Sequence, residues 1–186
     1  MCGIFAAIGS REVSPILIDG LRKLEYRGYD SAGIATIDNS NNDQIGKLNI
    51  KKTKGKLINL SNLMKKKTPK GNVGIGHTRW ATHGKPNKAN AHPHSSNDEK
   101  IYLIHNGVIE NYKSLKKFLT DKGITFKSQT DTEVLVQLIS YIYKNEKVTF
   151  EEAVKLSLSK VVGAYGIIAM CQDNPNELIA AKKGSP

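Results

Sequence analysis

The chain begins with the stretch Met1-Cys2-Gly3-Ile4-Phe5-Ala6-Ala7-Ile8-Gly9, in which a cysteine is followed directly by an apolar, strand-like run. Removal of Met1 would leave Cys2 with a thiol and a free α-amine on one residue. Such an amine has a reference pKa of about 7.7–8, so part of it is neutral near pH 7 and can act as a base. A chain-terminal amine beside a nucleophile is a known activating arrangement. By itself the stretch favours a simpler interpretation, a small residue that permits methionine removal, and the rest of the sequence must decide.

The composition is that of a globular protein, because 39% of the residues are hydrophobic and 24% are charged. A chain of 186 residues suits one domain with a sizeable core. Its two cysteines, Cys2 and Cys171, are too few for a disulfide framework, which indicates a reducing compartment. We find no signal peptide, and no apolar run approaches the roughly 18–20 residues that span a bilayer. We therefore expect a cytoplasmic protein that does not associate with a membrane.

The net charge of +11 comes in part from nine lysines between Lys47 and Lys70, a segment without an acidic residue. A basic stripe of this kind could bind the phosphates of a nucleic acid. The segment has no arginine, however, and no aromatic side chain to stack on bases. Leu57, Leu60 and Met64 recur at helical spacing. We interpret the lysines as the solvent-exposed face of an amphipathic helix and expect no nucleic-acid partner.

Periodicity and turn residues predict strands and helices that come in pairs. Ser14-Pro15 should begin the first helix as N-cap and first-turn proline, and Gly28 should end it. Capping boxes at Thr130–Glu133 and Thr149–Glu152 precede two later helices. The further predicted strands are 31–37, 44–50, 72–80, 101–105, 164–171 and 178–182, the last two joined by a turn at 174–176, and the later helices are 112–122, 132–144 and 150–160. Paired rather than strictly alternating elements favour antiparallel sheets with helices outside them.

Two polar clusters, Tyr26–Gly33 and Gly76–Gly84, lie at predicted strand ends, where functional sites are often built. The first is dense in glycine and charge, and taken alone it favours a capped turn that carries a surface Arg-Asp pair. In the second cluster, Arg79 can clamp a carboxylate through two parallel hydrogen bonds. The alternative for the second cluster is a strand end with a buried Trp80.

The third cluster, Asn90–His94, brings two histidines that could bind zinc together with His77 and His83. Structural zinc sites usually include cysteines, no His-Glu-x-x-His helix is present, and the spacing of His92 and His94 is not diagnostic. We therefore expect neither a metal nor a cofactor.

The fourth cluster is His105-Asn106-Gly107, followed later in the chain by Asp131. An asparagine amide and the next backbone N–H can point at one spot, as an oxyanion hole requires. Asn-Gly is also the strongest short hairpin signal, and Asp131 could simply be a first-turn acid favoured by the helix dipole. Taken together with Cys2 and Arg79, these residues describe attack on an amide carried by an amino acid.

In this combination the chain resembles the glutaminase domains of the glutamine:fructose-6-phosphate amidotransferase (glucosamine-6-phosphate synthase) family. These are class II glutamine amidotransferases of the N-terminal-nucleophile hydrolase type. Purine-pathway relatives share the Cys-Gly-Ile start, whereas the sequences of the segments Tyr26–Asp30 and Thr78–Gly84 resemble those of the sugar-phosphate branch. The matching segments occur in the family's order: 1–4, 24–33, 77–84, 90–94, 105–107 and 130–133.

The resemblance implies an α+β fold, a four-layer αββα sandwich of two antiparallel sheets, truncated at its C-terminus. It also implies one amidotransferase domain over residues 1–186, with the sugar-isomerase domains absent. Cys2 would be the nucleophile, with Arg27 supporting its surroundings, and Asn106 and Gly107 would stabilise the oxyanion. The implied substrate-binding residues are Arg79 for the α-carboxylate, Asp131 for the α-ammonium, and Trp80, Thr82 and His83 in a loop that closes over the substrate.

The implied substrate is L-glutamine, which would be hydrolysed to L-glutamate and ammonia. In the family's longer enzymes, sugar-isomerase domains bind fructose 6-phosphate and use this ammonia to make glucosamine 6-phosphate, and we expect the full-length enzyme to be a homo-oligomer. Two alternatives stay open from the sequence: the same half-reaction in a purine-branch amidotransferase, and an inactive regulatory or basic binding module.

Overall fold

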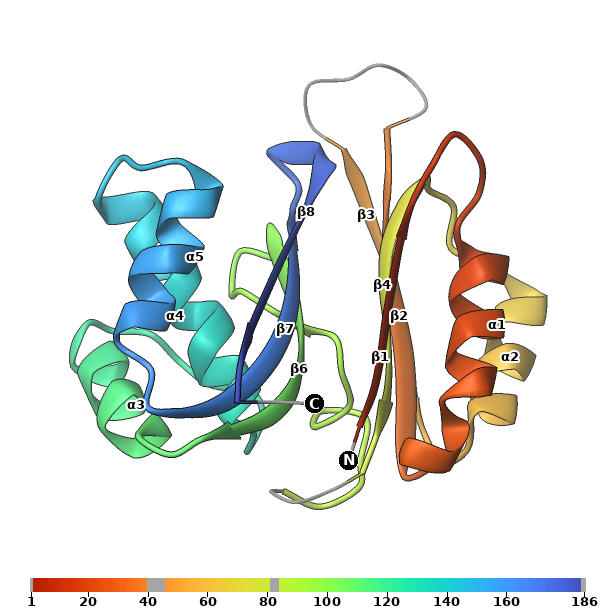
Figure 1. Ribbon diagram of the computed structural model, residues 1–186, viewed down its shortest axis with the longest axis horizontal. Coiled ribbons are helices and arrows are strands. Elements are labelled where there is room, and N and C mark those ends of the chain that lie inside the picture. The colour runs from red at the N-terminus through yellow and green to blue at the C-terminus, as the bar shows by residue number, and fades with distance from the viewer. Residues whose placement is uncertain (1, 40–45, 81–83, 185–186) are drawn as a thin grey trace.

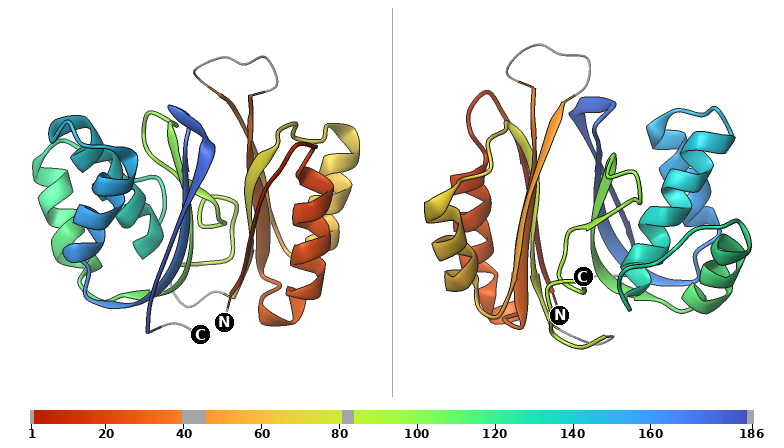
Figure 2. Two further views of the ribbon diagram at one scale, coloured as in Figure 1. Left: turned by 45° about the horizontal axis from the view of Figure 1, so that its top comes forward. Right: turned by 180° about the vertical axis from the view of Figure 1, so that it is seen from behind.

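Two antiparallel four-stranded sheets lie face to face in the computed structural model of this protein, and helices cover their outer faces (Figure 1). The structure describes residues 2–39, 46–80 and 84–184. Helices α1 and α2 cover one sheet, and α3, α4 and α5 cover the other, as the rotated views also show (Figure 2). The predicted four-layer αββα arrangement is confirmed.

The first sheet has the strand order β1-β4-β2-β3 and the second the order β5-β6-β7-β8. The first half of the fold consists of β1 (Gly3–Ile8), α1 (Ser14–Lys23), the short 3-10 helix η1 (Glu25–Arg27), β2 (Ser31–Asp38), β3 (Lys47–Lys54), α2 (Leu57–Lys66) and β4 (Val73–Arg79). The second half consists of β5 (His94–Ser95), β6 (Ile101–Ile109), α3 (Tyr112–Asp121), α4 (Asp131–Asn145), α5 (Phe150–Ser159), β7 (Gly163–Cys171) and β8 (Asn174–Lys183).

The alternation of side chains along the strands places the candidate site between the two sheets. Ile75 of β4 and Ile104 of β6 pack in one apolar cluster with residues of both sheets, and Ile4 of β1 packs against it. Residues two or four positions further along a strand point to the same face. Arg79, Asn106 and Cys2 therefore fall on the faces that the sheets turn toward each other.

The first helix differs from its prediction at both ends. Ser14 is the first helical residue rather than the N-cap, a position that Val13 takes without a side-chain bond. The Ser14 hydroxyl instead donates to the Pro69 carbonyl, so a tertiary partner outcompetes the cap. The helix ends at Lys23, and Gly28 follows η1 in extended backbone with a φ of −175°. Gly28 is there for close packing, because a Cβ on it would lie 2.6 Å from the Arg79 carbonyl carbon.

The lysine-rich segment is divided between a strand and a helix. Leu57, Leu60 and Met64 are buried on one face of α2, as predicted. The preceding strand, however, extends to Lys54 rather than ending at Ile50, because β3 pairs with β2 as far as Ser31. Residues 44 and 45 of the predicted strand lie outside the described residues. The interpretation of the whole lysine segment as the face of one helix was therefore wrong.

The Asn106-Gly107 pair does not form a hairpin turn. Strand β6 continues through it to Ile109 and stays paired with β7 along its whole length. The second predicted turn also moves: Asn174 to Asn176 already belong to β8, and the turn is Gln172-Asp173. Pro175 is accommodated because β8 lies at the edge of its sheet.

One of the two predicted capping boxes is complete. The Thr149 side chain accepts from the Glu152 N–H, and the Glu152 carboxylate accepts from the Thr149 N–H. At α4, Thr130 accepts from Glu133 N–H in the same way, but the Glu133 carboxylate accepts from the N–H groups of residues 127 and 128 instead. No helix in the described part of the chain is long and apolar enough to cross a membrane.

Candidate active site

The site centres on a contact between two residues that are 104 positions apart in the chain. The backbone nitrogen of Cys2 donates to Asn106 Oδ1 at 3.2 Å. Asn106 is 9% exposed and is held in β6, where it pairs with Gly166 of β7. Because Oδ1 faces Cys2, the other end of the Asn106 amide, Nδ2, is a hydrogen-bond donor beside the same residue. The structure therefore brings Cys2 and Asn106 together, two residues that the sequence analysis had singled out separately.

The Cys2 thiol lies against the backbone of Trp80. The Trp80 N–H donates to Sγ at 3.5 Å, and Sγ lies 3.8 Å from the Trp80 carbonyl oxygen. Burial raises the pKa of the Cys2 thiol, while the Trp80 backbone and the nearby Arg79 charge act in the opposite direction. A thiol with a raised pKa is largely protonated near neutral pH, so its use as a nucleophile requires a base close by.

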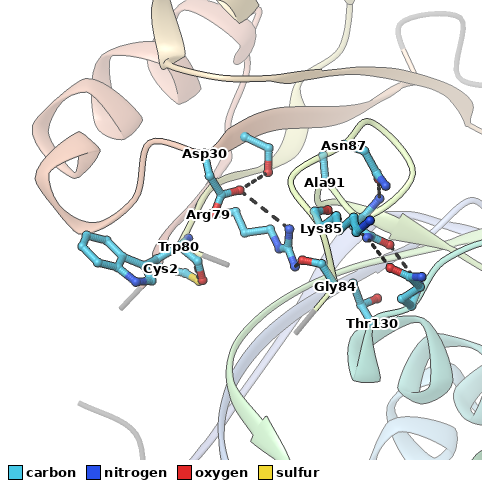
Figure 3. Close-up of polar contacts among 12 residues, drawn as sticks. Cys2, Asp30, Arg79, Trp80, Gly84, Lys85, Asn87, Ala91 and Thr130 are labelled. Carbon is cyan, nitrogen blue, oxygen red and sulfur yellow. Dashed lines mark hydrogen bonds and ion pairs between the residues drawn. The ribbon is translucent and has the colours of Figure 1, made fainter. Parts of the chain in front are cut away.

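Arg79 ends β4 with its side chain buried and fixed from two sides (Figure 3). Its Nη1 lies 3.7 Å from Asp30 Oδ1, and its Nη2 donates to the Gly84 carbonyl at 3.2 Å. Asp30 is itself oriented, because Ser31 Oγ donates to Asp30 Oδ1 at 2.9 Å and the Asp30 N–H donates to the Arg79 carbonyl. The guanidinium is therefore held in one place before any ligand binds.

A pocket of about 230 Å³ opens at this arginine. Trp80 is 45% exposed, and its ring packs edge-to-face on Tyr29 with 5.4 Å between the centroids. The alternative of a strand end with a buried Trp80 is therefore contradicted, since Trp80 follows the last residue of β4 and leaves the sheet. The pocket is lined by Tyr29, Asp30, Arg79, Trp80 and Pro86. The pocket therefore places the Arg79 guanidinium beside Trp80, the residue whose backbone contacts the Cys2 thiol.

Asp131 is the first residue of α4 and is 8% exposed. Its Oδ2 accepts from the Ile109 N–H at 2.9 Å and lies 4.0 Å from His105 Nδ1. The contacts found for Asp131 thus join α4 to β6, two residues beyond Gly107. This position agrees with both interpretations made from the sequence, a first-turn acid and a site residue.

The remaining residues that the sequence analysis assigned to the site are Gly107, Arg27, Thr82 and His83, and the structure describes only the first two. Gly107 has a φ of +142°, and a Cβ on it would lie 2.1 Å from the Ala164 carbonyl oxygen, so only glycine fits. Arg27 lies in η1, and the next residue, Gly28, packs on the backbone of β4. Thr82 and His83 lie outside the described residues.

Sequence reasoning missed the partner of Arg79. The sequence favoured a surface Arg-Asp pair within 26–33, whereas the structure places Asp30 against the buried Arg79 of a different strand. No local pattern predicts this pairing, which arises because β2 and β4 are neighbours and Ser31 lies opposite Arg79.

Sequence reasoning weighed three of four buried histidines only as zinc ligands and did not group His105 with them. We call this group the histidine cluster: His77, His92, His94 and His105. Burial lowers the pKa of every member. The ring nitrogens contact the hydroxyls of Thr130 and Thr132 and the carbonyl of His105. Among the described residues, no group of three or more His, Cys, Asp or Glu side chains is arranged to hold a metal ion.

Comparison with known proteins points to one family. The family model described as "Glutamine amidotransferase domain" matches residues 64–149. The chain is 56% identical over its full length to a glutamine--fructose-6-phosphate aminotransferase [isomerizing] of Bacteroides thetaiotaomicron and 48% identical to that of Clostridium acetobutylicum. It covers 30% and 29% of these two proteins, so it spans less than a third of the length of these curated relatives.

Solved structures show the same fold. The glutamine phosphoribosylpyrophosphate amidotransferase of B. subtilis, complexed with ADP and GMP, superposes with a TM-score of 0.81 at 31% identity, over 98% of this chain and 37% of that one. A second structure, described as the allosteric regulatory enzyme of purine biosynthesis, gives a TM-score of 0.82. With the Cys2–Asn106 geometry, these similarities establish that the chain is a domain of the class II glutamine amidotransferases, related along its whole length to the glutamine--fructose-6-phosphate aminotransferases.

Proposed function

We propose that this domain hydrolyses L-glutamine to L-glutamate and ammonia, with Cys2 as the nucleophile after Met1 has been removed. The observation that carries the proposal is the 3.2 Å contact between the Cys2 nitrogen and Asn106 Oδ1. It puts a thiol, the nitrogen that would become a free amine, and an amide donor in one place. Arg79 lies at the pocket next to them, which suits a substrate that carries a carboxylate.

The first chemical step is attack on the side-chain amide of glutamine. The neutral α-amine of Cys2 takes the thiol proton, directly or through a water, and the resulting thiolate forms a bond to the amide carbon. Negative charge moves to the carbonyl oxygen, where Asn106 Nδ2 and the Gly107 N–H donate to it. Loss of one such donor typically lowers kcat by about 10²–10³.

The tetrahedral species then breaks its bond to nitrogen. The leaving nitrogen takes the proton from the Cys2 ammonium and departs as ammonia, which leaves a glutamyl thioester on Cys2. Water, activated by the same amine, adds to the thioester, and glutamate leaves with the thiol restored. The raised pKa of the Cys2 thiol makes this base necessary, since little thiolate forms near pH 7 without it.

The substrate's amino-acid end would be held away from the reacting amide. Arg79 would bind the α-carboxylate, and Asp131 would bind the α-ammonium. Trp80, Thr82 and His83 would belong to the segment that closes over glutamine, and Arg27 would support the surroundings of Cys2. The exposed Trp80 ring agrees with a position at the pocket mouth.

The test compares four preparations in a glutamate-release assay, and intact mass shows in each whether Met1 has been removed. We expect the unsubstituted chain and Cys171→Ser to release glutamate, because Cys171 is fully buried in β7. We expect Cys2→Ser to be inactive, and likewise a variant in which an uncleaved segment precedes Cys2. Equal rates for Cys2→Ser and the unsubstituted chain would contradict the assignment. Retained Met1 together with no activity would favour the inactive binding module.

We further propose that, in a longer protein with sugar-isomerase domains, the ammonia is transferred to fructose 6-phosphate to give glucosamine 6-phosphate. Identities of 56% and 48% to proteins named for this activity support it more strongly than 31% identity to the phosphoribosylpyrophosphate amidotransferase. The test supplies amide-¹⁵N glutamine and either fructose 6-phosphate or phosphoribosylpyrophosphate to the full-length protein. Label in an amino sugar supports the proposal, and label in a phosphoribosylamine supports the purine branch instead.

A further inference from the structure

One hydrogen bond of the histidine cluster crosses directly from one sheet to the other. His77 Nε2 of β4 donates to the His105 carbonyl of β6 at 3.0 Å, and His77 is fully buried. That carbonyl belongs to the peptide group that joins His105 to Asn106. The bond therefore acts on the backbone of the residue that contacts Cys2.

His105 is held a second time through its ring. Its Nδ1 contacts Thr132 Oγ1 at 3.0 Å, and the same hydroxyl contacts His92 Nε2 at 2.9 Å. The His92 ring stacks on His77, with 4.0 Å between centroids and 13° between planes. The contacts form a closed circuit, from His77 to His105 to Thr132 to His92 and back to His77. All four residues are at most 5% exposed.

The positions of the protons on the His77 and His92 rings follow from the hydrogen-bond partners of their nitrogens. In the described part of the structure, Nδ1 of His77 and Nδ1 of His92 are buried without a hydrogen-bond partner. An orphaned N–H is rarer in buried sites than an orphaned acceptor, so both rings carry their proton on Nε2. His92 then donates to the Thr132 hydroxyl oxygen, and the Thr132 hydroxyl donates to Asp131 Oδ1 at 3.5 Å. Burial lowers the pKa of His77 to about 3 and also lowers the pKa values of His92 and His105, so the three rings are neutral near pH 7.

The circuit connects the two sheets at the site. Arg79 follows His77 by two residues on β4, and β4 pairs with β1 so that Thr78 lies opposite Gly3, the neighbour of Cys2. On the other side, β6 carries Asn106. A shift of β6 relative to β4 would therefore change the distance between Cys2 and Asn106.

We propose that His77 is a positioning residue that sets Asn106 opposite Cys2 through its hydrogen bond to the His105 carbonyl. The inference rests on the proposed glutaminase function, which it deepens. His77 contacts the peptide of Asn106 and not the pocket, so its loss should slow the chemical step and leave glutamine binding nearly unchanged. Displacement of a reacting group by about 1 Å costs about 10²-fold in rate.

The test compares His77→Leu, which removes the donor, with His77→Gln, whose Nε2 amide can still donate at the same reach. We expect His77→Leu to lower kcat by about 10²-fold with KM for glutamine changed by less than about twofold. His77→Gln should recover most of kcat. Equal losses in the two variants, or a raised KM with an unchanged kcat, would overturn the proposal.

A second measurement separates this proposal from the proposed function and does not need an active protein. Long-range ¹⁵N–¹H NMR of the unsubstituted chain should show neutral His77 with its proton on Nε2. The Asn106 side-chain amide resonance should move in His77→Leu and stay near its original position in His77→Gln. An inactive unsubstituted chain with these signals refutes the glutaminase function alone. A proton on His77 Nδ1, or an Asn106 amide that His77→Leu leaves in place, refutes the positioning role.

Discussion

Substitution of Gly107 by alanine should destabilise the fold far more than a glycine substitution of the same chemical size elsewhere. Gly107 has a φ of +142°, and a Cβ on it would lie 2.1 Å from the Ala164 carbonyl oxygen. Ala164 lies opposite Val108 in the β6–β7 ladder, so its carbonyl cannot move without disturbing the pairing of both strands. Alanine therefore meets backbone strain and a steric clash together.

The expected loss in the free energy of unfolding of Gly107→Ala is the sum of these two contributions. An unfavourable φ of this kind costs about 1–3 kcal/mol, and overpacking against fixed atoms costs about 1–3 kcal/mol more. A loss of about 4 kcal/mol in the free energy of unfolding corresponds to a Tm lower by about 8–16 °C for a chain of this size. Gly123 supplies the matched control, because its φ is +82° but nothing lies within 4 Å of its Cβ position. Gly123→Ala should cost only about 1 kcal/mol.

The assay is urea unfolding followed by far-UV circular dichroism, with thermal scans in parallel. The reasoning predicts that Gly107→Ala loses about 3 kcal/mol more than Gly123→Ala, from a clash added to a similar strain. Stabilities within about 1 kcal/mol of each other would refute it, because they would show that β6 and β7 adjust at no cost.

Three further predictions concern other parts of the molecule. The folded pKa of each member of the histidine cluster lies below its usual value, so the unfolded chain binds more protons below about pH 6.5. The free energy of unfolding should then decrease as the pH is lowered below about 6.5, by up to about 1.4 kcal/mol per pH unit for each histidine. Urea unfolding that is unchanged between pH 7.5 and pH 5 would contradict this. Arg79→Lys should raise KM for glutamine by at least about tenfold, because an ammonium cannot make the two parallel hydrogen bonds that a guanidinium makes to a carboxylate. An unchanged KM in steady-state kinetics would count against the binding of the substrate carboxylate by Arg79. Thr149→Ala should cost about 1 kcal/mol in urea unfolding through loss of the complete capping box, and a neutral result would show that α5 does not depend on its cap.

Local patterns predicted most elements because they depend on neighbours in the chain. The spacing of Leu57, Leu60 and Met64 predicted α2, and the Thr149–Glu152 pattern predicted the start of α5. The failures occur where a distant partner outcompeted a local preference. Ser14 bonds to the Pro69 carbonyl instead of capping its own helix. Asn106-Gly107 stays in a strand because β7 pairs with it on both sides of the expected turn.

The chemistry of the candidate site could also be predicted from the sequence, since a thiol nucleophile, a guanidinium and an amide donor are recognisable side-chain types. Their positions relative to one another were not. Asp30 appeared to belong to a surface pair and is instead the partner of Arg79, because β2 and β4 are adjacent in the sheet. Three members of the histidine cluster, His77, His92 and His94, were weighed only as zinc ligands together with His83. The hydrogen bonds of the cluster to Thr132 and to the His105 carbonyl appear only in the folded chain.

The sequence by itself determined which segments form strands and helices and which side chains can do chemistry, because periodicity, caps and functional groups are properties of short stretches. Only the tertiary structure decided that Cys2 meets Asn106 across 104 residues and that His77 of one sheet bonds to the backbone beside Asn106 in the other. The physical reason is that such contacts are set by the register within each sheet and by the packing between the two sheets. No local pattern of residues 1–9 or of His105-Asn106-Gly107 encodes that packing.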